Sequence, residues 1–209
     1  TEPQVEPTEG AVTVTNPMEP QTVNIEQTGA YQVDVYLDLT PDSIPPPDAS
    51  KLRDGLIGAW SLDGDARSPW GEKELVGELA GDAKFVDSPF GQAIALDGNT
   101  GAAVIPYDDA MNVADGPFTV AAWIRPRELR QAGIVCLGGY GSTHGWLFDM
   151  PGDNGVLRIE TANADGQHNG TAQSRTGVLR AGRWQHVAVV VRRGGHQTRL
   201  YVNGYEVGV

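Results

Sequence analysis

Apolar segments separated by glycine- and aspartate-bearing turns recur along the chain and predict strands. The clearest examples lie near the C-terminus, where residues 184–191 form a valine-rich apolar run and residues 198–202 alternate between apolar and polar. The first pattern is typical of a strand covered on both faces, and the second of a strand covered on one. Asn203 and Gly204 then predict a type I′ hairpin turn, because both central residues of that turn need a positive φ. The pattern predicts an antiparallel meander.

Further strands are expected before this meander, at roughly ten-residue spacing. No window has the periodicity of an amphipathic helix; residues 128–132 form one turn at most. We therefore predict an all-β fold, a two-sheet antiparallel jelly-roll sandwich. Its other strands are expected at residues 55–62, 73–79, 83–87, 92–97, 101–106, 118–125 (a central strand), 133–137, 145–149, 156–161 and 176–179.

The first fifty residues differ in composition from the rest. They hold nine of the 27 Asp and Glu residues and none of the 15 Lys and Arg residues, so they carry most of the net charge of −12. This acidic, proline-rich composition is typical of a solvated linker, and residues 45–47 (Pro-Pro-Pro) predict a stiff spacer. Two alternating segments predict a β-hairpin over residues 22–37. We divide the chain into a linker with this hairpin, residues 1–50, and one β domain, residues 51–209.

Charge, hydropathy and cysteine content exclude several functions. Neither part of the chain has a basic face, so we expect no nucleic-acid partner. No apolar run reaches membrane-spanning length, so we expect no membrane insertion. Cys136, the one cysteine, lies in an apolar run and is expected to be buried. It has no second cysteine to pair with, which excludes an internal disulfide and a Cys-x-x-Cys metal or haem site.

Four blocks of sequence resemble laminin-G-like domains, which are concanavalin-A-like jelly rolls. In order they are GLIGAWSLDGDA (55–66), FGQAIALDGNTGAAVIP (90–106), GPFTVAAWIRP (116–126) and GRWQHVAVVVRRGGHQTRLYVNGYEV (182–207). The segment between the last two blocks resembles versions embedded in large exported proteins of planctomycete-type bacteria, which also carry cytochrome-c-like regions. The resemblance implies a bacterial, multidomain, exported protein, periplasmic, cell-surface or secreted. It also implies one more C-terminal strand, which would follow Val209 and is not in this sequence.

The resemblance raises glycoside hydrolysis as one function, and the residues argue against it. That chemistry needs two carboxylates flanking the scissile bond, which jelly-roll hydrolases carry as Glu-x-Asp-x-x-Glu or a near variant on one strand. No such run occurs here: Glu72, Glu74 and Glu78 lie in a polar stretch and not in a valine-rich strand. Asp108 and Asp109 are adjacent and would point to opposite faces of a strand. We expect a chain that is not an enzyme, with hydrolysis kept as an alternative.

Carbohydrate recognition is the function that we predict, with an interaction domain that docks other domains of the same protein as the alternative. A sugar stacks on an aromatic ring while polar side chains bind its hydroxyl groups. Trp60, Trp123 and Trp184 lie in apolar strands and are expected in the core, and His186 is expected to be a structural imidazole. If the polar loops 140–146 and 163–170 neighbour each other, they form a site with an aromatic wall. Its expected ligand-binding residues are Tyr140, His144, Trp146, Asp165, Gln167, His168 and Asn169.

Calcium is the cofactor that the resemblance implies, since laminin-G-like domains often bind one Ca²⁺ through an aspartate and backbone carbonyls. Asp63 ends the first expected strand, and Asp97 and Asn99 belong to an Asp-Gly-Asn turn. These three residues are the candidate ligands. Aspartates in turns also cap their own backbone without any metal, so both interpretations stay open.

Overall fold

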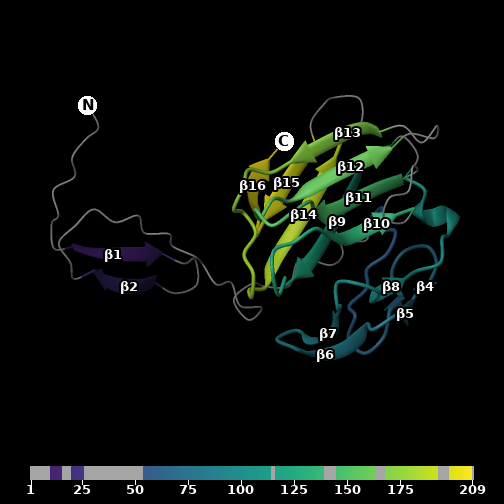
Figure 1. The fold of residues 1–209 in the computed structure, drawn as a ribbon, viewed down its shortest axis with the longest axis horizontal. Coiled ribbons are helices and arrows are strands. Elements are labelled where there is room, and N and C mark those ends of the chain that lie inside the picture. The colour runs from purple at the N-terminus through teal and green to yellow at the C-terminus, as the bar shows by residue number, and fades with distance from the viewer. Residues whose placement is uncertain are drawn as a thin grey trace. The chain divides into compact units, whose positions relative to one another are not determined.

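The computed structural model describes residues 54–113, 116–138, 145–162, 168–192 and 198–208, and only the backbone of residues 10–15, 20–25, 168 and 169. Every strand pair is antiparallel, and the described residues form no α-helix, only the 3₁₀ turn Asp109–Met111. The predicted all-β sandwich is therefore confirmed (Figure 1). Within the described part of the chain, no helix is long and apolar enough to cross a membrane.

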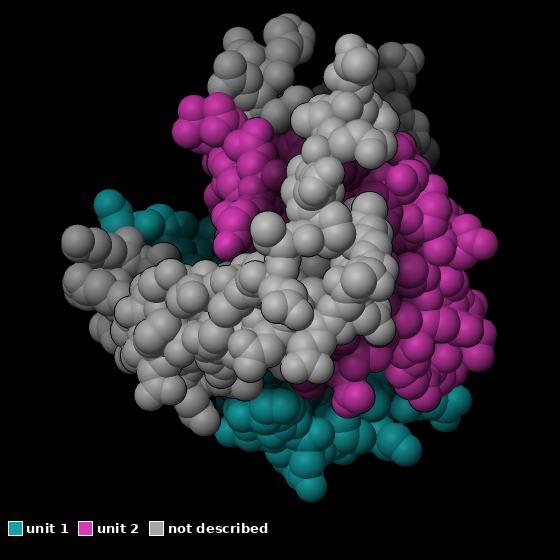
Figure 2. Space-filling view, turned by 90° about the vertical axis from the view of Figure 1, so that its left-hand side faces the viewer, with its two compact units in different colours: residues 1–96, 100–105 teal, residues 97–99, 106–209 magenta. Residues whose placement is uncertain are grey.

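The chain divides into two compact units, coloured separately in Figure 2. Unit 1 consists of residues 1–96 and 100–105, and unit 2 of residues 97–99 and 106–209. Unit 1 begins with the hairpin of β1 (Gly10–Thr15) and β2 (Pro20–Ile25). β2 contains the first strand of the hairpin predicted at residues 22–37 but pairs with β1, and the second strand of that prediction lies outside the described residues.

The rest of unit 1 consists of short strand pairs. The strands predicted near residues 84, 92 and 102 are confirmed. Their sequences consist of short apolar stretches between polar turns, a pattern that favours strands. The pairs are β3 (Arg67–Ser68) with β4 (Leu75–Val76), β5 (Glu78–Ala80) with β8 (Ala102–Val104), and β6 (Lys84–Ser88) with β7 (Gly91–Ala95).

The strand predicted at residues 55–62 is wrong. These residues are described and pair with no other described segment. A strand needs a ladder partner, and here the backbone N–H of Ala59 instead donates to the Ser68 Oγ atom at 2.8 Å. Leu62 has a φ of +58°, which takes the chain out of the β region at the end of the segment.

Unit 2 contains two four-stranded sheets (Figure 1). We call the sheet with the order β10-β11-β12-β13 the first sheet and the one with the order β16-β15-β14-β9 the second sheet. β9, predicted to be central, lies at the end of the second sheet. The bounds are β9 Phe118–Ile124, β10 Ala132–Leu137, β11 Gly145–Met150, β12 Arg158–Ala162, β13 His168–Gln173, β14 Gln185–Val191, β15 Arg199–Val202 and β16 Tyr205–Gly208.

The core of unit 2 lies between these two sheets. In β14, Val187 and Val189 are fully buried while His186, Ala188 and Val190 are half-buried, so one face of the strand points into the core. The apolar run predicted a strand buried on both faces, but the second face of β14 is only half-buried. Phe148 and Ile159 contribute the same inward face of the first sheet. The buried cluster consists of Phe148, Met150, Leu157, Ile159, Leu179, Val187, Val189, Val191, Leu200 and Val202.

Two further expectations in unit 2 are wrong. Residues 176–179 form a turn, with Gly177 at a φ of +73°, and the strand lies earlier, at β13. The β13 sequence is polar and was assigned to a loop, but a strand that ends a sheet tolerates polar residues on its outward side. Cys136 is exposed, because β10 directs it to the outer face beside Leu147 of β11.

Candidate functional site

The strand pairing brings together the ends of the two polar loops predicted to bind sugar. Gly145 pairs with Ala162 and Ala162 with His168, so the segments that join β10 to β11 and β12 to β13 are attached to the same end of the first sheet. The loop residues Tyr140, His144, Asp165 and Gln167 lie outside the described residues, as do the side chains of His168 and Asn169. Ligand binding by these residues therefore stays a prediction.

Trp146, the remaining residue of that predicted site, lies against the core. Its ring centroid is 5.5 Å from that of Phe118 on β9, with a tilted geometry. The indole packs on the buried cluster, and its Nε1 atom is buried with no hydrogen-bond partner among the described residues. This packing favours a structural role for Trp146 over an aromatic wall beside the loops.

The three candidate calcium ligands each lie in a turn. The Asp63 Oδ1 atom accepts the backbone N–H of Gln92 at 2.7 Å, and the Asp97 Oδ1 atom accepts that of Asn99 at 3.0 Å. The Asp97 bond is the local cap that turn aspartates make without a metal, whereas the Asp63 bond joins two segments that lie 29 positions apart in the chain. Among the described residues, no group of three or more His, Cys, Asp or Glu side chains gathers to hold a metal ion. These contacts do not fit a formed cation site, and calcium binding stays a prediction.

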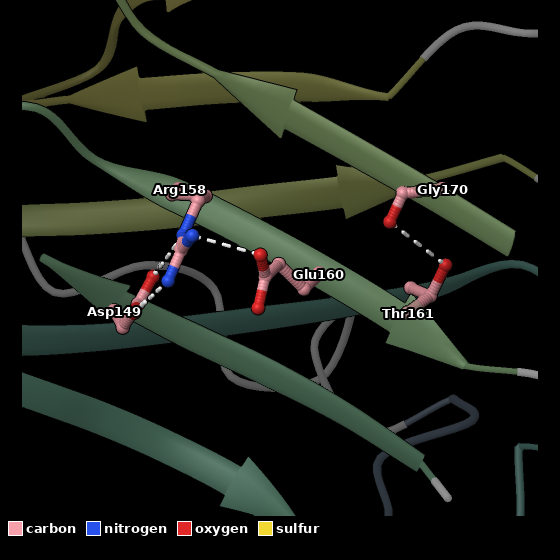
Figure 3. A network of polar contacts seen from close by, with 5 residues as sticks. All are labelled: Asp149, Arg158, Glu160, Thr161 and Gly170. Atoms are coloured by element: carbon pink, nitrogen blue, oxygen red, sulfur yellow. Dashed lines mark hydrogen bonds and ion pairs between the residues drawn. The ribbon is translucent and has the colours of Figure 1, made fainter. Parts of the chain in front are cut away.

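The outer face of the first sheet carries a buried charge network (Figure 3). Arg158 on β12 donates through Nε and Nη2 to the two carboxylate oxygens of Asp149 on β11, at 2.9 and 2.6 Å. Its Nη1 atom also lies 2.7 Å from Glu160 Oε1. The side chain of Asp149 is fully buried, whereas those of Arg158 and Glu160 keep 16% and 22% of their surface exposed.

The two hydrogen bonds between Asp149 and Arg158 fix the mutual orientation of their side chains. A bidentate guanidinium–carboxylate pair allows one mutual orientation, and Asp149 and Arg158 are direct cross-strand partners. Chemically, the network presents the carboxylate of Glu160 next to Thr171, its exposed cross-strand partner on β13. The network could not be predicted from the sequence, because Asp149 and Arg158 are nine positions apart and only the β11–β12 register joins them.

The outer face of the second sheet carries aromatic side chains. We call it the aromatic face and define it by Trp123, His186 and Tyr201 with Ala121 and Ala188 between them. Trp123 and His186 are cross-strand partners on β9 and β14, and their rings meet edge to face at 5.4 Å and 65°. Trp123 keeps 37% of its surface exposed. Burial lowers the pKa of His186 below its usual value, so its imidazole is neutral at neutral pH.

The turn between β15 and β16 holds the backbone beneath this pair. The N–H of Asn203 donates to the His186 carbonyl at 2.7 Å, and the Asn203 Oδ1 atom accepts the N–H of His186 at 2.9 Å. Asn203 and Gly204 have φ values of +50° and +81°, which confirms the predicted type I′ turn. The same turn that closes the hairpin therefore positions His186 in the sheet.

Trp123 was expected in the core, and this expectation is wrong. The residues of β9 that pack on the core are Phe118, Val120, Ala122 and Ile124, which are two apart. Trp123 is out of phase with them, so it must point to the opposite face. The alternation in the sequence places Trp123 on the face opposite to Phe118 and Ile124, but which of the two faces packs on the core depends on residues far along the chain.

One comparison with known proteins agrees with this geometry. Residues 97–209 match a laminin-G-type family model described as the concanavalin A-like lectin/glucanases superfamily. The match covers more than half of the chain and begins where unit 2 begins. No curated protein and no solved structure matches the chain. The chain belongs to the concanavalin A-like lectin/glucanases superfamily.

Proposed function

We propose that the chain is a non-catalytic carbohydrate-recognition module, with the aromatic face as its binding surface. The observation that carries the proposal is the exposed indole of Trp123 on the outer face of a rigid sheet. An apolar ring face exposed to water is suited to stacking against the C–H groups of a sugar, because both surfaces lose water on contact. The backbone beneath it is fixed by seven paired residues of β14, so little ordering is needed on binding.

Polar groups beside the indole supply hydrogen bonds to hydroxyl groups. The neutral imidazole of His186 has one nitrogen that donates and one that accepts. Farther along the face, Arg199 and Glu206 form an ion pair with 3.3 Å between Nη1 and Oε2, and 42% of each side chain stays exposed. This combination of an apolar platform with a few fixed polar groups is typical of small-molecule sites.

The aromatic face favours binding over hydrolysis. Glycoside hydrolysis needs two carboxyl groups flanking the bond, and among the described residues of this face Glu206 is the one carboxylate, paired with Arg199. The carboxylates of Asp149 and Glu160 belong to the first sheet, and both bind Arg158. We further propose that the module works within an exported multidomain protein.

Glycan binding is tested on an array of neutral, acidic and amino-sugar glycans, with calcium and with a chelator. We expect binding by the wild-type chain and at least a tenfold loss in Trp123→Ala, because the stacking surface is removed. Trp70→Ala is the control, since Trp70 is another exposed tryptophan, with 42% of its surface accessible, in unit 1.

Three outcomes would count against parts of this proposal. Failure of every glycan to bind would favour the interaction-domain alternative. Equal binding by Trp123→Ala and the wild type, with unchanged circular dichroism, would move the site away from the aromatic face. Binding that survives the chelator would contradict a calcium role for Asp63, Asp97 and Asn99.

A further inference from the structure

We infer that the aromatic face binds an extended stretch of a neutral glycan chain, several sugar units long, instead of a single terminal sugar. The inference rests on the proposed function and adds a second ring, Tyr201, to the site. Tyr201 lies on β15 between the buried residues Leu200 and Val202, so it points to the same outer face as Trp123.

The strand register sets the distance between the Cα atoms of Trp123 and Tyr201. Trp123 pairs with His186 of β14, and Tyr201 pairs with Ala188, two residues along the same strand. Trp123 and Tyr201 are thus two strand spacings apart across the sheet, about 10 Å, and about 7 Å apart along it. The resulting separation of about 12 Å between their Cα atoms exceeds the length of one pyranose ring. One sugar unit can therefore stack on either ring but not on both.

The residues next to the two rings include two with very short side chains. Ala121 and Ala188 are cross-strand partners that occupy the row next to Trp123 and His186, and both carry only a methyl group. Ala121 is exposed and Ala188 is half-buried. The path between the two rings crosses β14 between Ala188 and His186, so a chain that stacks on both rings passes over these methyl groups with the imidazole beside it. Two aromatic rings with a floor of alanines between them match a linear ligand.

The charges on this face favour a neutral chain. Within the bounds of its four strands, the charged residues are Arg199 and Glu206, which form an ion pair with each other and are equally exposed. Arg125 and Arg192 follow the ends of β9 and β14, and Arg125 donates through Nε to the Gly182 carbonyl at 3.0 Å. An acidic sugar would have to compete with Glu206 for the guanidinium, and an amino sugar with Arg199 for the carboxylate. Uncharged hydroxyl groups can bind both without breaking the pair.

Calorimetry with oligomers of increasing length tests the inference. The probes are linear β-1,4- and β-1,3-linked glucose oligomers, from monosaccharide to hexasaccharide, with galacturonate oligomers as the acidic comparison. We expect affinity for at least one neutral series to rise about tenfold or more from monosaccharide to tetrasaccharide, as the second ring is reached, and then to level off. Galacturonate oligomers should bind at least tenfold more weakly.

Variants separate the two rings. Tyr201→Ala should remove most of the gain in affinity with chain length, because only one ring remains for stacking. Ala188→Leu should weaken the longer oligomers most, because its larger side chain stands between the two rings. Tyr205→Ala is the matched control, because Tyr205 is an exposed tyrosine, with 65% of its surface accessible, on the neighbouring strand β16 and pairs with the inward-pointing Val202. Circular dichroism and thermal melts of each variant verify folding.

The inference and the proposed function fail differently. Glycan binding that is equal for monosaccharide and hexasaccharide, or unchanged length dependence in Tyr201→Ala, would overturn the extended site while leaving recognition intact. Absence of binding to every glycan would overturn the proposed function itself. Sedimentation that shows a dimer dissociated by Ala188→Leu would assign the face to a second copy of the chain and overturn both.

Discussion

At the scale of single residues, His186 combines a structural and a surface position. Its backbone is held by Asn203, and its ring contacts Trp123 on the aromatic face. Burial of the imidazole disfavours its charged form, which lowers its pKa from the value of 6.5 that the unfolded chain would have. Protonation of this one residue therefore couples the stability of the second sheet to pH.

The free energy of unfolding should fall as the pH is lowered below 6.5. In that range the unfolded chain takes up a proton at His186 and the folded chain does not, so protons favour the unfolded state. The part of the free energy of unfolding that is linked to the neutral His186 is fully present above pH 6.5. It is lost as the pH falls toward the lowered pKa of His186 in the folded protein. Urea titrations of the wild type and His186→Gln between about pH 5 and 8 check it. A pH dependence that is identical in the variant would contradict the assignment to His186.

Residue positions could be predicted from the sequence where local geometry alone decides them. The Asn203-Gly204 turn is such a case, because positive φ values restrict which residues can occupy it. The exposure of Trp123 depends on which face of β9 meets the first sheet, and that is decided by residues far along the chain. Cys136 was expected to be buried and is exposed for the same reason, because the face of β10 that packs on the core is also decided by residues far along the chain.

At the scale of elements, pairing between strands decides what the sequence pattern leaves open. Apolar content predicts a strand at residues 176–179, but the strand lies at the more polar β13, because a ladder partner and not apolar content decides which segment becomes a strand. The partner of β13 is β12, in a register that places Ile159 opposite Ala172. The charge network on β11 and β12 is likewise a product of register, since it joins Asp149 to its cross-strand partner Arg158.

Removal of Arg158 should destabilise the first sheet strongly. Arg158→Leu leaves the fully buried Asp149 carboxylate without its cation, and an unpaired buried charge costs about 3–5 kcal/mol of the free energy of unfolding. The double variant Asp149→Leu, Arg158→Leu removes both charges and should regain most of that loss. Glu160→Gln, at a partly exposed position, is the control and should lose much less.

Chemical denaturation of the four proteins measures these differences. A double variant as unstable as Arg158→Leu alone would show that packing by the arginine side chain, and not the unpaired charge, accounts for the loss.

At the scale of the whole molecule, burial is uneven between the two units. The whole buried cluster belongs to unit 2, whereas Ala66 and Leu75 are the buried apolar residues in the described part of unit 1. Unit 1 pairs its strands two by two, while unit 2 builds two sheets of four. Hydrophobic burial is the main source of stability, so the two units are expected to differ in local stability. The family match likewise covers only the well-buried part.

Native-state hydrogen exchange should resolve this difference. Amide hydrogens of β14, whose Val187 and Val189 side chains are fully buried and whose backbone pairs on both sides, should exchange only through global unfolding. Amide hydrogens of β3 to β8 should exchange through lower-energy openings, because each strand there has one partner and little apolar cover. Exchange followed by mass spectrometry at rising denaturant would place β14 on the global unfolding line and β3 to β8 below it. Equal opening free energies for the two sets would instead mean that the strands of unit 1 unfold together with the sandwich, and that their few internal contacts are not what sets their stability.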